Sequence, residues 1–135
     1  MFNTKIAILI DPDLASWQKL NVTAFLASGI AGAVPEAMGA PYEDAAGRVH
    51  ASLLGQPVMI FAAAPDILQR AWSKSIDRNL IRAGYVRAMF ATGHDAANRE
   101  VFRSEPLDAP DLVGIAVHGA RKDVDKVIKG AKLHP

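Results

Sequence analysis

The sequence predicts an α/β domain of three layers, in which a mixed central sheet of four main strands carries helices on both faces. Three observations support this prediction. Apolar runs of strand length alternate along the chain with amphipathic helical segments, the order that builds an α/β layer fold. The 135 residues suit one domain spanning 1–135. Half of the residues are hydrophobic, which is enough for a core without disulfide or metal staples.

The start of the chain predicts a buried strand followed by a helix. Residues 5–10 (KIAILI) form a continuous apolar run, which is typical of a strand that is buried on both faces. Pro12 ends this strand, because proline cannot donate to a sheet ladder. A helix is expected from Ser16 to Ser28, before Gly29. Its buried stripe is expected to hold the residues that recur at helical spacing, namely Trp17, Leu20, Ala24 and Ala27.

Residues 30–54 form an insert without a clear amphipathic pattern. Its glycines and prolines argue against a long helix. We interpret residues 42–50 as a small hairpin with Asp44–Gly47 at its turn, although a helical turn broken at Gly47 would also fit. The apolar residues of the insert exceed what a sheet of this size easily buries. They predict a two-fold homodimer, the alternative being an insert that completes the core of the monomer.

The second half of the chain continues the alternation. The expected elements are a strand at 57–62, a helix at 66–82, a strand at 85–91, a polar loop at 92–105, a strand at 112–119, and a short helix with a tail at 120–133. Crossover helices make the first pairings parallel. The long connection that contains Pro106 and Pro110 would allow the last strand to run antiparallel. Trp72 is expected in the core, like Trp17.

Composition excludes several classes of protein. The formal net charge of +1 indicates no basic field for nucleic acid. No apolar run approaches the ~20 residues of a membrane span, and the five apolar residues before Asp11 are too few for a signal peptide. The chain contains no cysteine, which excludes disulfides and thiolate chemistry. We therefore expect a cytoplasmic protein without a membrane partner, and nucleic acid is not indicated.

The motifs of metal and cofactor sites are missing from the sequence. None of the four histidines has the spacing of a zinc site. The glycines form neither a dinucleotide fingerprint nor a phosphate-binding loop, and no serine lies in a nucleophile elbow. No metal and no cofactor are expected.

Candidate ligand-binding residues lie where polar segments follow the first and third strands. Lys19 and Asn21 lie near the start of the first helix, and His94 and Asp95 follow the third strand. Open α/β sheets bind ligands at the edge where their strands end, so these four residues predict a small-molecule site there. The alternatives are a solvated helix start for the first pair and a polar turn for the second.

Several segments resemble the second, archaeal and eukaryotic class of peptidyl-tRNA hydrolase. They are the first strand followed by Asp13-Leu14, the segment Gly55-Gln56-Pro57, and the closing strand with the helix DVDKVIKGAKL. The resemblance implies the fold of that class but not its active site. Lys19 can stand for the first of the class's two lysines, whereas Asn21 falls where the catalytic lysine belongs. Phe25 and Ser28 replace its glutamine and histidine.

The segment from Trp17 to Phe25 (WQKLNVTAF) also resembles a family known as domain of unknown function 2000, which is similar in fold to these hydrolases and has no assigned activity. Three functions are compatible with this resemblance. We rank first a small soluble ligand-binding or regulatory domain in which the catalytic residues are not retained. The others are a hydrolase acting on peptidyl-tRNA or a related ester, and a structural or interaction subunit that acts as an oligomer.

Overall fold

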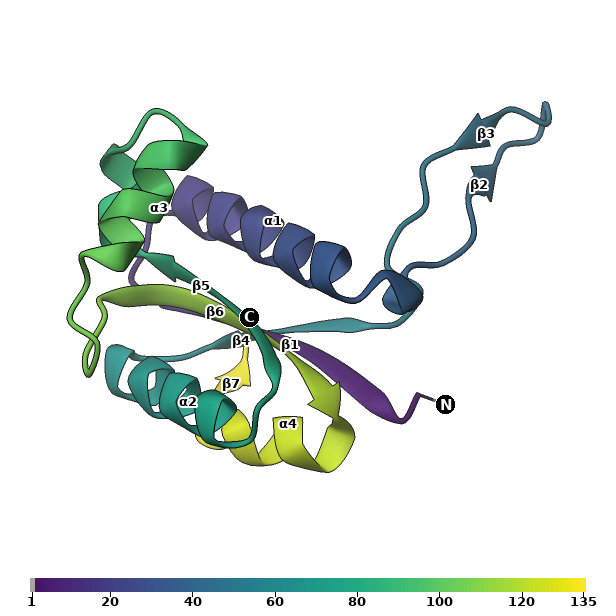
Figure 1. Ribbon diagram of the computed structural model, residues 1–135. Helices are drawn as coiled ribbons and strands as arrows, with labels where there is room; N and C mark the ends of the chain where they lie inside the picture. The colour runs from purple at the N-terminus through teal and green to yellow at the C-terminus, as the bar shows by residue number, and fades with distance from the viewer. Residues whose placement is uncertain (1) are drawn as a thin grey trace.

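The computed structural model describes residues 2–135 and has a mixed central sheet (Figure 1). Its five strands, in their order across the sheet, are β5 (Ile81–Val86), β6 (Leu112–Ala120), β1 (Thr4–Ile10), β4 (Val58–Ala62) and β7 (Lys132–Leu133). The predicted α/β class and mixed sheet are confirmed. The expected number of four strands is wrong, because β7 pairs with β4 as a short fifth strand.

The strand directions bring the ends of three strands to one edge. β1 runs parallel to β4 and antiparallel to β6, and β5 is also antiparallel to β6. β5 therefore has the direction of β1, so the C-terminal ends of β1, β4 and β5 share one edge of the sheet. The antiparallel course of the last long strand, β6, agrees with the sequence-based expectation.

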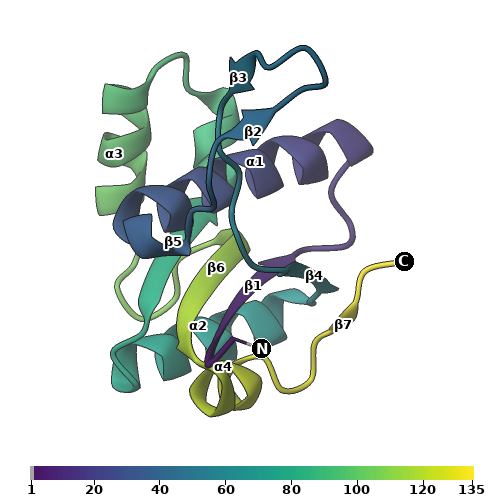
Figure 2. The ribbon, with the colours of Figure 1, turned by 90° about the vertical axis from the view of Figure 1, so that its right-hand side faces the viewer.

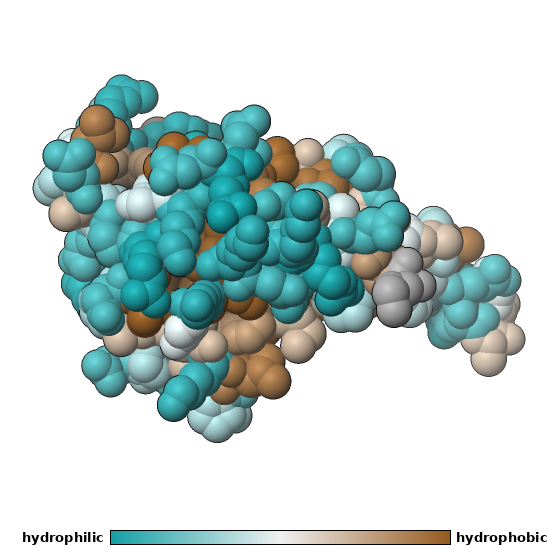
Figure 3. All heavy atoms as spheres, turned by 90° about the horizontal axis from the view of Figure 1, so that it is seen from below, coloured by the Kyte–Doolittle hydropathy of each residue, from teal (hydrophilic) through white to brown (hydrophobic). Residues whose placement is uncertain are grey.

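Helices cover both faces of the sheet, as the sequence predicts. α1 (Ser16–Ala33) lies on one face, and α2 (Pro65–Asp77) and α4 (Arg121–Val127) lie on the other (Figure 1). Viewed from the side of α2 and α4, the surface is mainly hydrophilic (Figure 3). No helix among residues 2–135 has both the length and the apolar character that crossing a membrane requires.

β1 separates two hydrophobic cores. Ile6 and Ile8 pack with α1, whereas Ala7 and Leu9 pack with α2 and α4, since successive side chains of a strand point to opposite faces. All four are completely buried. Each buried isoleucine or leucine contributes roughly 1.5–3 kcal/mol relative to an exposed one, which explains why this run occupies the centre of the sheet.

The buried face of α1 differs from the expected stripe. Val22 and Ile30 are buried, whereas Trp17 and Leu20 are 62 % and 72 % exposed, so the prediction that Trp17 lies in the core is wrong. α1 is apolar on more than one side, so helical spacing alone admits more than one buried stripe. The choice is made by β6, because Gly114 leaves room for Val22. A β-carbon at Gly114 would lie 2.6 Å from Cγ1 of Val22.

Several boundaries differ from those expected. α1 continues through Gly29 to Ala33 instead of ending at Ser28. α2 ends at Asp77 instead of Arg82, because Asn79 adopts the left-handed region with φ 53° and reverses the chain. Residues 87–91, expected as strand, form the 3₁₀ helix η2 (Arg87–Ala91). Trp72 packs against the core as expected.

Two further expectations are corrected near the C-terminus. Residues 92–105, expected as a polar loop, contain the helix α3 (Asp95–Arg103). The helix expected over 120–133 ends at Val127, and Gly130 turns the chain into β7 with φ 96°.

The insert at residues 30–54 divides into a core part and a projecting part. Its beginning, through the 3₁₀ helix η1 (Pro35–Ala37), joins the core on the α1 side. Residues 39–55, which we call the arm, extend away from the body of the protein (Figure 1). The arm contains the predicted hairpin, formed by β2 (Tyr42–Glu43) and β3 (Val49–His50).

Asp44 organises the turn of the arm. Its carboxylate accepts hydrogen bonds from the backbone N–H groups of Ala46 at 2.9 Å and Arg48 at 3.1 Å, and from the side chain of Arg48 at 2.8 Å. Nε2 of His50 lies 2.9 Å from the same carboxylate. These hydrogen bonds, first that of His50 and then those of Arg48, lower the pKa of Asp44. Gly47 completes the turn with φ 83°, which glycine adopts without strain.

Candidate functional site

The ends of β1 and β5 lead into segments that enclose a hollow. α1 follows β1, and η2 and α3 follow β5. α3 stands beside α1 in both ribbon views (Figures 1 and 2). The hollow between these elements, which we call the aromatic hollow, has a volume of about 390 Å³. It is lined by Trp17, Asn21, Phe25, Tyr85, Met89, Phe90, Thr92, Gly93, His94, Asp95 and Asn98.

Four aromatic rings form a connected wall of this hollow. Trp17 meets Phe90 edge to face, with 5.8 Å between the ring centroids. Tyr85 lies between Phe90 and Phe25, at centroid distances of 5.3 and 6.0 Å. Aromatic pairs prefer such edge and tilted contacts, so the rings support one another. Trp17 and Phe25 nevertheless remain 62 % and 53 % exposed, leaving a large apolar surface in contact with water.

Asn21 joins this wall to the polar side of the hollow. Its Nδ2 donates a hydrogen bond to the hydroxyl of Tyr85 at 3.3 Å. Burial raises the pKa of Tyr85, and the Asn21 hydrogen bond opposes this rise only in part. Tyr85 is therefore a neutral phenol near neutral pH, and it holds the amide of Asn21 in place.

Two residues at the start of α3 supply further polar groups. His94 caps this helix, because its Nδ1 accepts a hydrogen bond from the backbone N–H of Ala97 at 3.2 Å. The neutral imidazole therefore carries its proton on Nε2. The side chain of Asn98 contacts the hydroxyl of Thr92, which also donates a hydrogen bond to the backbone oxygen of Met89 at 2.9 Å.

Asp95 is engaged along its own helix. Its carboxylate forms an ion pair with Arg99 one turn further on, and both side chains are exposed. Such an i,i+4 pair on a helix surface contributes roughly 0.3–0.5 kcal/mol. Asp95 thus lines the hollow as half of a charge pair, and no hydrogen bond joins it to the neighbouring His94.

The structure brings three of the four candidate residues together. Asn21, His94 and Asp95 line the aromatic hollow, whereas Lys19 lines a separate hollow with Leu20, Ile60 and His134. Residues two apart on a helix are separated by about 200° around its axis, so Lys19 and Asn21 face different sides of α1. Among residues 2–135, no three histidine, aspartate or glutamate side chains gather as a metal site would require.

The sequence reasoning missed Trp17, Phe25, Phe90 and Asn98 as lining residues. The sequence pattern predicts Trp17 in the core and Asn98 in a loop. The composition of α1 could have indicated Trp17 and Phe25: the helix has more apolar residues than one buried face can hold, so some of them must be exposed. Phe90 and Asn98 had no such signal, because η2 and α3 were not foreseen.

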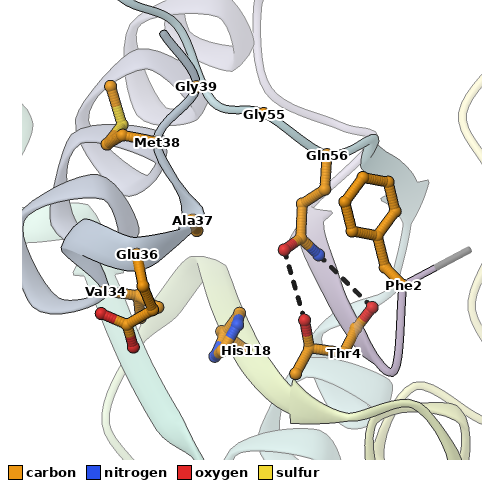
Figure 4. A pocket seen from close by; sticks show the side chains of 10 residues that line it. All are labelled: Phe2, Thr4, Val34, Glu36, Ala37, Met38, Gly39, Gly55, Gln56 and His118. Carbon is orange, nitrogen blue, oxygen red and sulfur yellow. Dashed lines mark hydrogen bonds between the residues drawn. The ribbon is translucent and has the colours of Figure 1, made fainter.

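A second hollow of about 390 Å³ lies at the opposite edge of the sheet, beside Gly39 and Gly55 at the two ends of the arm (Figure 4). Thr4 Oγ1 donates to Gln56 Oε1 at 3.2 Å, and Gln56 Nε2 donates to the backbone oxygen of Thr4 at 3.3 Å. His118 lies between this pair and Glu36 (Figure 4). Thr4 and Gln56 pair with each other here, and this hollow lacks the wall of four aromatic rings that lines the first.

By its fold and its aromatic hollow, the protein is an α/β domain with a cavity of small-molecule size, which lies where its parallel strands end. The chain belongs to the family described as "Protein of unknown function (DUF2000)", whose model matches residues 4–135. The structure is similar to that of Atu0240, a protein of unknown function from Agrobacterium tumefaciens strain C58. The two share 49 % sequence identity over 100 % of each chain, with a TM-score of 0.96. A search of curated proteins found no match.

Proposed function

We propose that this protein is a small-molecule-binding or regulatory domain and that its ligand occupies the aromatic hollow. One observation carries the proposal: two half-exposed aromatic rings, Trp17 and Phe25, converge with three polar side chains that are each held by a hydrogen bond or ion pair. Ligand sites combine an apolar wall with a few oriented polar groups in this way. The cysteine-free sequence supports a cytoplasmic location.

The exposed rings offer a useful free energy of binding. Covering both would remove roughly 200 Å² of aromatic surface from water, and at about 25 cal/mol per Å² this contributes about 5 kcal/mol before the entropic costs of association. Hydrogen bonds to groups that are already oriented add to this without a further ordering cost. Because 5 kcal/mol corresponds to a Kd of about 0.2 mM before those costs, we expect an affinity in the millimolar range.

Nuclear magnetic resonance tests this proposal with a collection of small fragments. We expect binding fragments to shift the indole N–H of Trp17 and the side-chain amides of Asn21 and Asn98. The indole N–H of Trp72, which packs in the opposite core, serves as the internal control. If fragments shift only resonances around Lys19 or His118, the ligand site lies in another hollow and the proposal is wrong.

The resemblance to the second class of peptidyl-tRNA hydrolase supports the proposal that this protein shares the fold of that class but does not catalyse its reaction. Asn21 stands where that class has its catalytic lysine, and its amide is engaged by Tyr85. We expect the purified protein to release no peptide from peptidyl-tRNA above background, since lost general-acid or electrostatic groups cost on the order of 10²–10⁴-fold in rate. Activity that Lys19→Ala abolishes would favour the hydrolase alternative instead.

The arm supports a second role, that of a homodimer contact. Tyr42, Val49 and Leu53 are 56 %, 70 % and 59 % exposed, and the strands of the arm pair only with each other. An isolated two-stranded hairpin is marginally stable in water, so a partner surface would stabilise it. Closed two-fold pairs are the commonest solution, and a second copy of the chain is the proposed partner.

Light scattering at micromolar concentration tests the homodimer. We expect a mass of about twice 14.4 kDa for the natural chain and the monomer mass after Tyr42, Val49 and Leu53 are all changed to serine. Three matched serine substitutions at Ala51, Ala40 and Ala88, which are exposed small residues, should leave the mass unchanged. A monomer mass for the natural chain would exclude this role of the arm.

A further inference from the structure

We infer that the side of α1 turned away from the sheet docks against the same side of a second copy, with the two helices antiparallel. We call this side the outer face and define it by residues at helical spacing, namely Trp17, Leu20, Ala24, Ser28 and Ala31. The inference rests on the homodimer proposed above and extends it from the arm to a defined pair of helices.

No charged side chain lies on the outer face of α1. Lys19 is the one charged residue in this helix, and it lines the hollow beside Ile60 on another side of α1. By contrast, α2, α3 and α4 each expose several charged side chains to water. A helix that is apolar around its circumference is normally buried on all sides, so its composition indicates that the outer face of α1 is covered by a partner.

The area of the exposed apolar surface is close to what a stable dimer needs. Trp17 and Leu20 are 62 % and 72 % exposed. α1 is about 27 Å long, and one helix width of its surface presents roughly 300 Å². Tyr42, Val49 and Leu53 of the arm, each more than half exposed, add a similar area. The total of roughly 600 Å² per copy approaches the ~800 Å² that each partner buries in a stable interface.

The order of side-chain sizes along the outer face favours an antiparallel pair. The large residues Trp17 and Leu20 lie in the first half of the helix, and the small residues Ser28 and Ala31 lie in the second half. A two-fold axis beside Ala24 sets Leu20 of one copy against Ser28 of the other, and Trp17 against Ala31. The large side chains then fill the space that the small ones leave, as close packing requires. A parallel pair would set Trp17 against Trp17 and leave a gap at the small end.

The segments at the two ends of α1 fit the same arrangement. α3 stands at the start of α1, the arm leaves from its end, and both rise past α1 on the side away from the sheet (Figure 1). An antiparallel pair therefore brings the arm of each copy to α3 of the other. Asn21 and Phe25 line the aromatic hollow on a different side of α1 from the outer face, so this pairing is compatible with a ligand there.

Opposite charges introduced at Ala24 test the helix pair. Ala24 is exposed, so Ala24→Glu and Ala24→Lys should fold normally, which circular dichroism and thermal unfolding verify. Each variant would place two like charges beside the axis, so light scattering at micromolar concentration should show the monomer mass of 14.4 kDa. An equal mixture of the two variants pairs Glu with Lys and should restore the dimer. Ala109→Glu and Ala109→Lys make the same changes at an exposed residue outside α1 and should leave the natural mass unchanged.

Engineered cysteines test the antiparallel direction, because the chain contains no cysteine of its own. Under oxidising conditions, mixed Leu20→Cys and Ser28→Cys proteins should form a disulfide-linked pair, whereas Leu20→Cys alone should not. The two copies of residue 20 would lie about 12 Å apart along the helix axis, beyond the ~7 Å between α-carbons that a disulfide can span. Rapid crosslinking of Leu20→Cys with itself would show a parallel pair and overturn the inferred geometry.

The outcomes separate this inference from the proposals on which it rests. A dimeric natural chain with both Ala24 variants still dimeric would overturn α1 as the interface and leave the arm contact standing. Two monomeric Ala24 variants whose mixture stays monomeric would overturn the two-fold alignment. A monomeric natural chain would exclude both the homodimer and this inference, while the fragment experiment still decides the ligand site.

Discussion

Gly114 controls where α1 sits, so we predict that Gly114→Ala both destabilises the protein and alters the aromatic hollow. A β-carbon at this position would lie 2.6 Å from Cγ1 of Val22, 3.1 Å from Cδ1 of Leu26 and 3.2 Å from Cδ1 of Ile10. The three neighbours are 2 % exposed or less, so none can rotate into water. α1 has to move away from the sheet instead.

The magnitude follows from overpacking of a close-packed core. Forcing one extra carbon into such a site costs typically 1–3 kcal/mol. With an unfolding entropy of roughly 2.1 cal/mol/K per residue, this corresponds to a fall in Tm of about 4–10 °C for a chain of this length. Because α1 also carries Trp17, Asn21 and Phe25, its displacement should change the fluorescence of Trp17 in the folded state.

Thermal and urea denaturation measure this effect, and the chain offers a matched control. Gly32 lies in α1 with no atom within 4 Å of its β-carbon position, so Gly32→Ala should stabilise the helix by roughly 0.5–1 kcal/mol. Combining Gly114→Ala with Val22→Ala removes the closest clash and should recover part of the loss. Equal stability of Gly114→Ala and the natural chain would refute the packing argument.

Three further predictions concern single side chains. His94→Ala removes the cap of α3 and should cost about 1 kcal/mol, whereas His94→Asn restores a capping side chain and should cost less; urea denaturation measures both. The pKa of Tyr85 is raised in the folded protein, so the neutral phenol contributes its full stability below pH 10 and loses it as the pH rises through the folded-state pKa. Between pH 9 and pH 11, Tyr85→Phe should therefore lose less Tm than the natural chain does. The pKa of Asp44 is lowered in the folded protein, so its hydrogen bonds are kept above its ordinary pKa of 3.8 and are lost as the pH falls through the folded-state pKa. In a nuclear magnetic resonance titration, the Asp44 carboxyl resonance should have its midpoint below pH 3.8, and His50→Ala should move that midpoint upward.

Local sequence patterns were sufficient for the elements whose partners are close or unambiguous. The run of residues 5–10 is apolar on both faces and can be buried only in the middle of a sheet, where it is found as β1. The hairpin turn at Asp44–Gly47 depends on contacts within a few residues, which the sequence itself contains. The α/β class follows from the order of such elements.

The candidate site depended on information that is not local. Asn21, His94 and Asp95 come together because β1 and β5 run in the same direction, which the sequence indicated only as an alternation of elements. Lys19 lies elsewhere because the rotation of α1 about its axis is set by its packing partner. The capping role of His94 and the free Nε2–H that follows from it required α3, which was hidden in a stretch rich in polar residues.

The sequence by itself therefore determined that the chain is an α/β domain and that residues 5–10 and 112–119 are buried strands, because each depends on the apolar character of neighbouring residues. Its turn chemistry favoured the hairpin at Asp44–Gly47 over a broken helical turn. The tertiary structure alone decided which side of α1 is buried, how the arm projects, and which polar groups share a hollow. The reason is physical: α1 is apolar around much of its circumference, and only the space left by Gly114 in β6 selects Val22 for the core and leaves Trp17 and Phe25 exposed beside the ends of the strands.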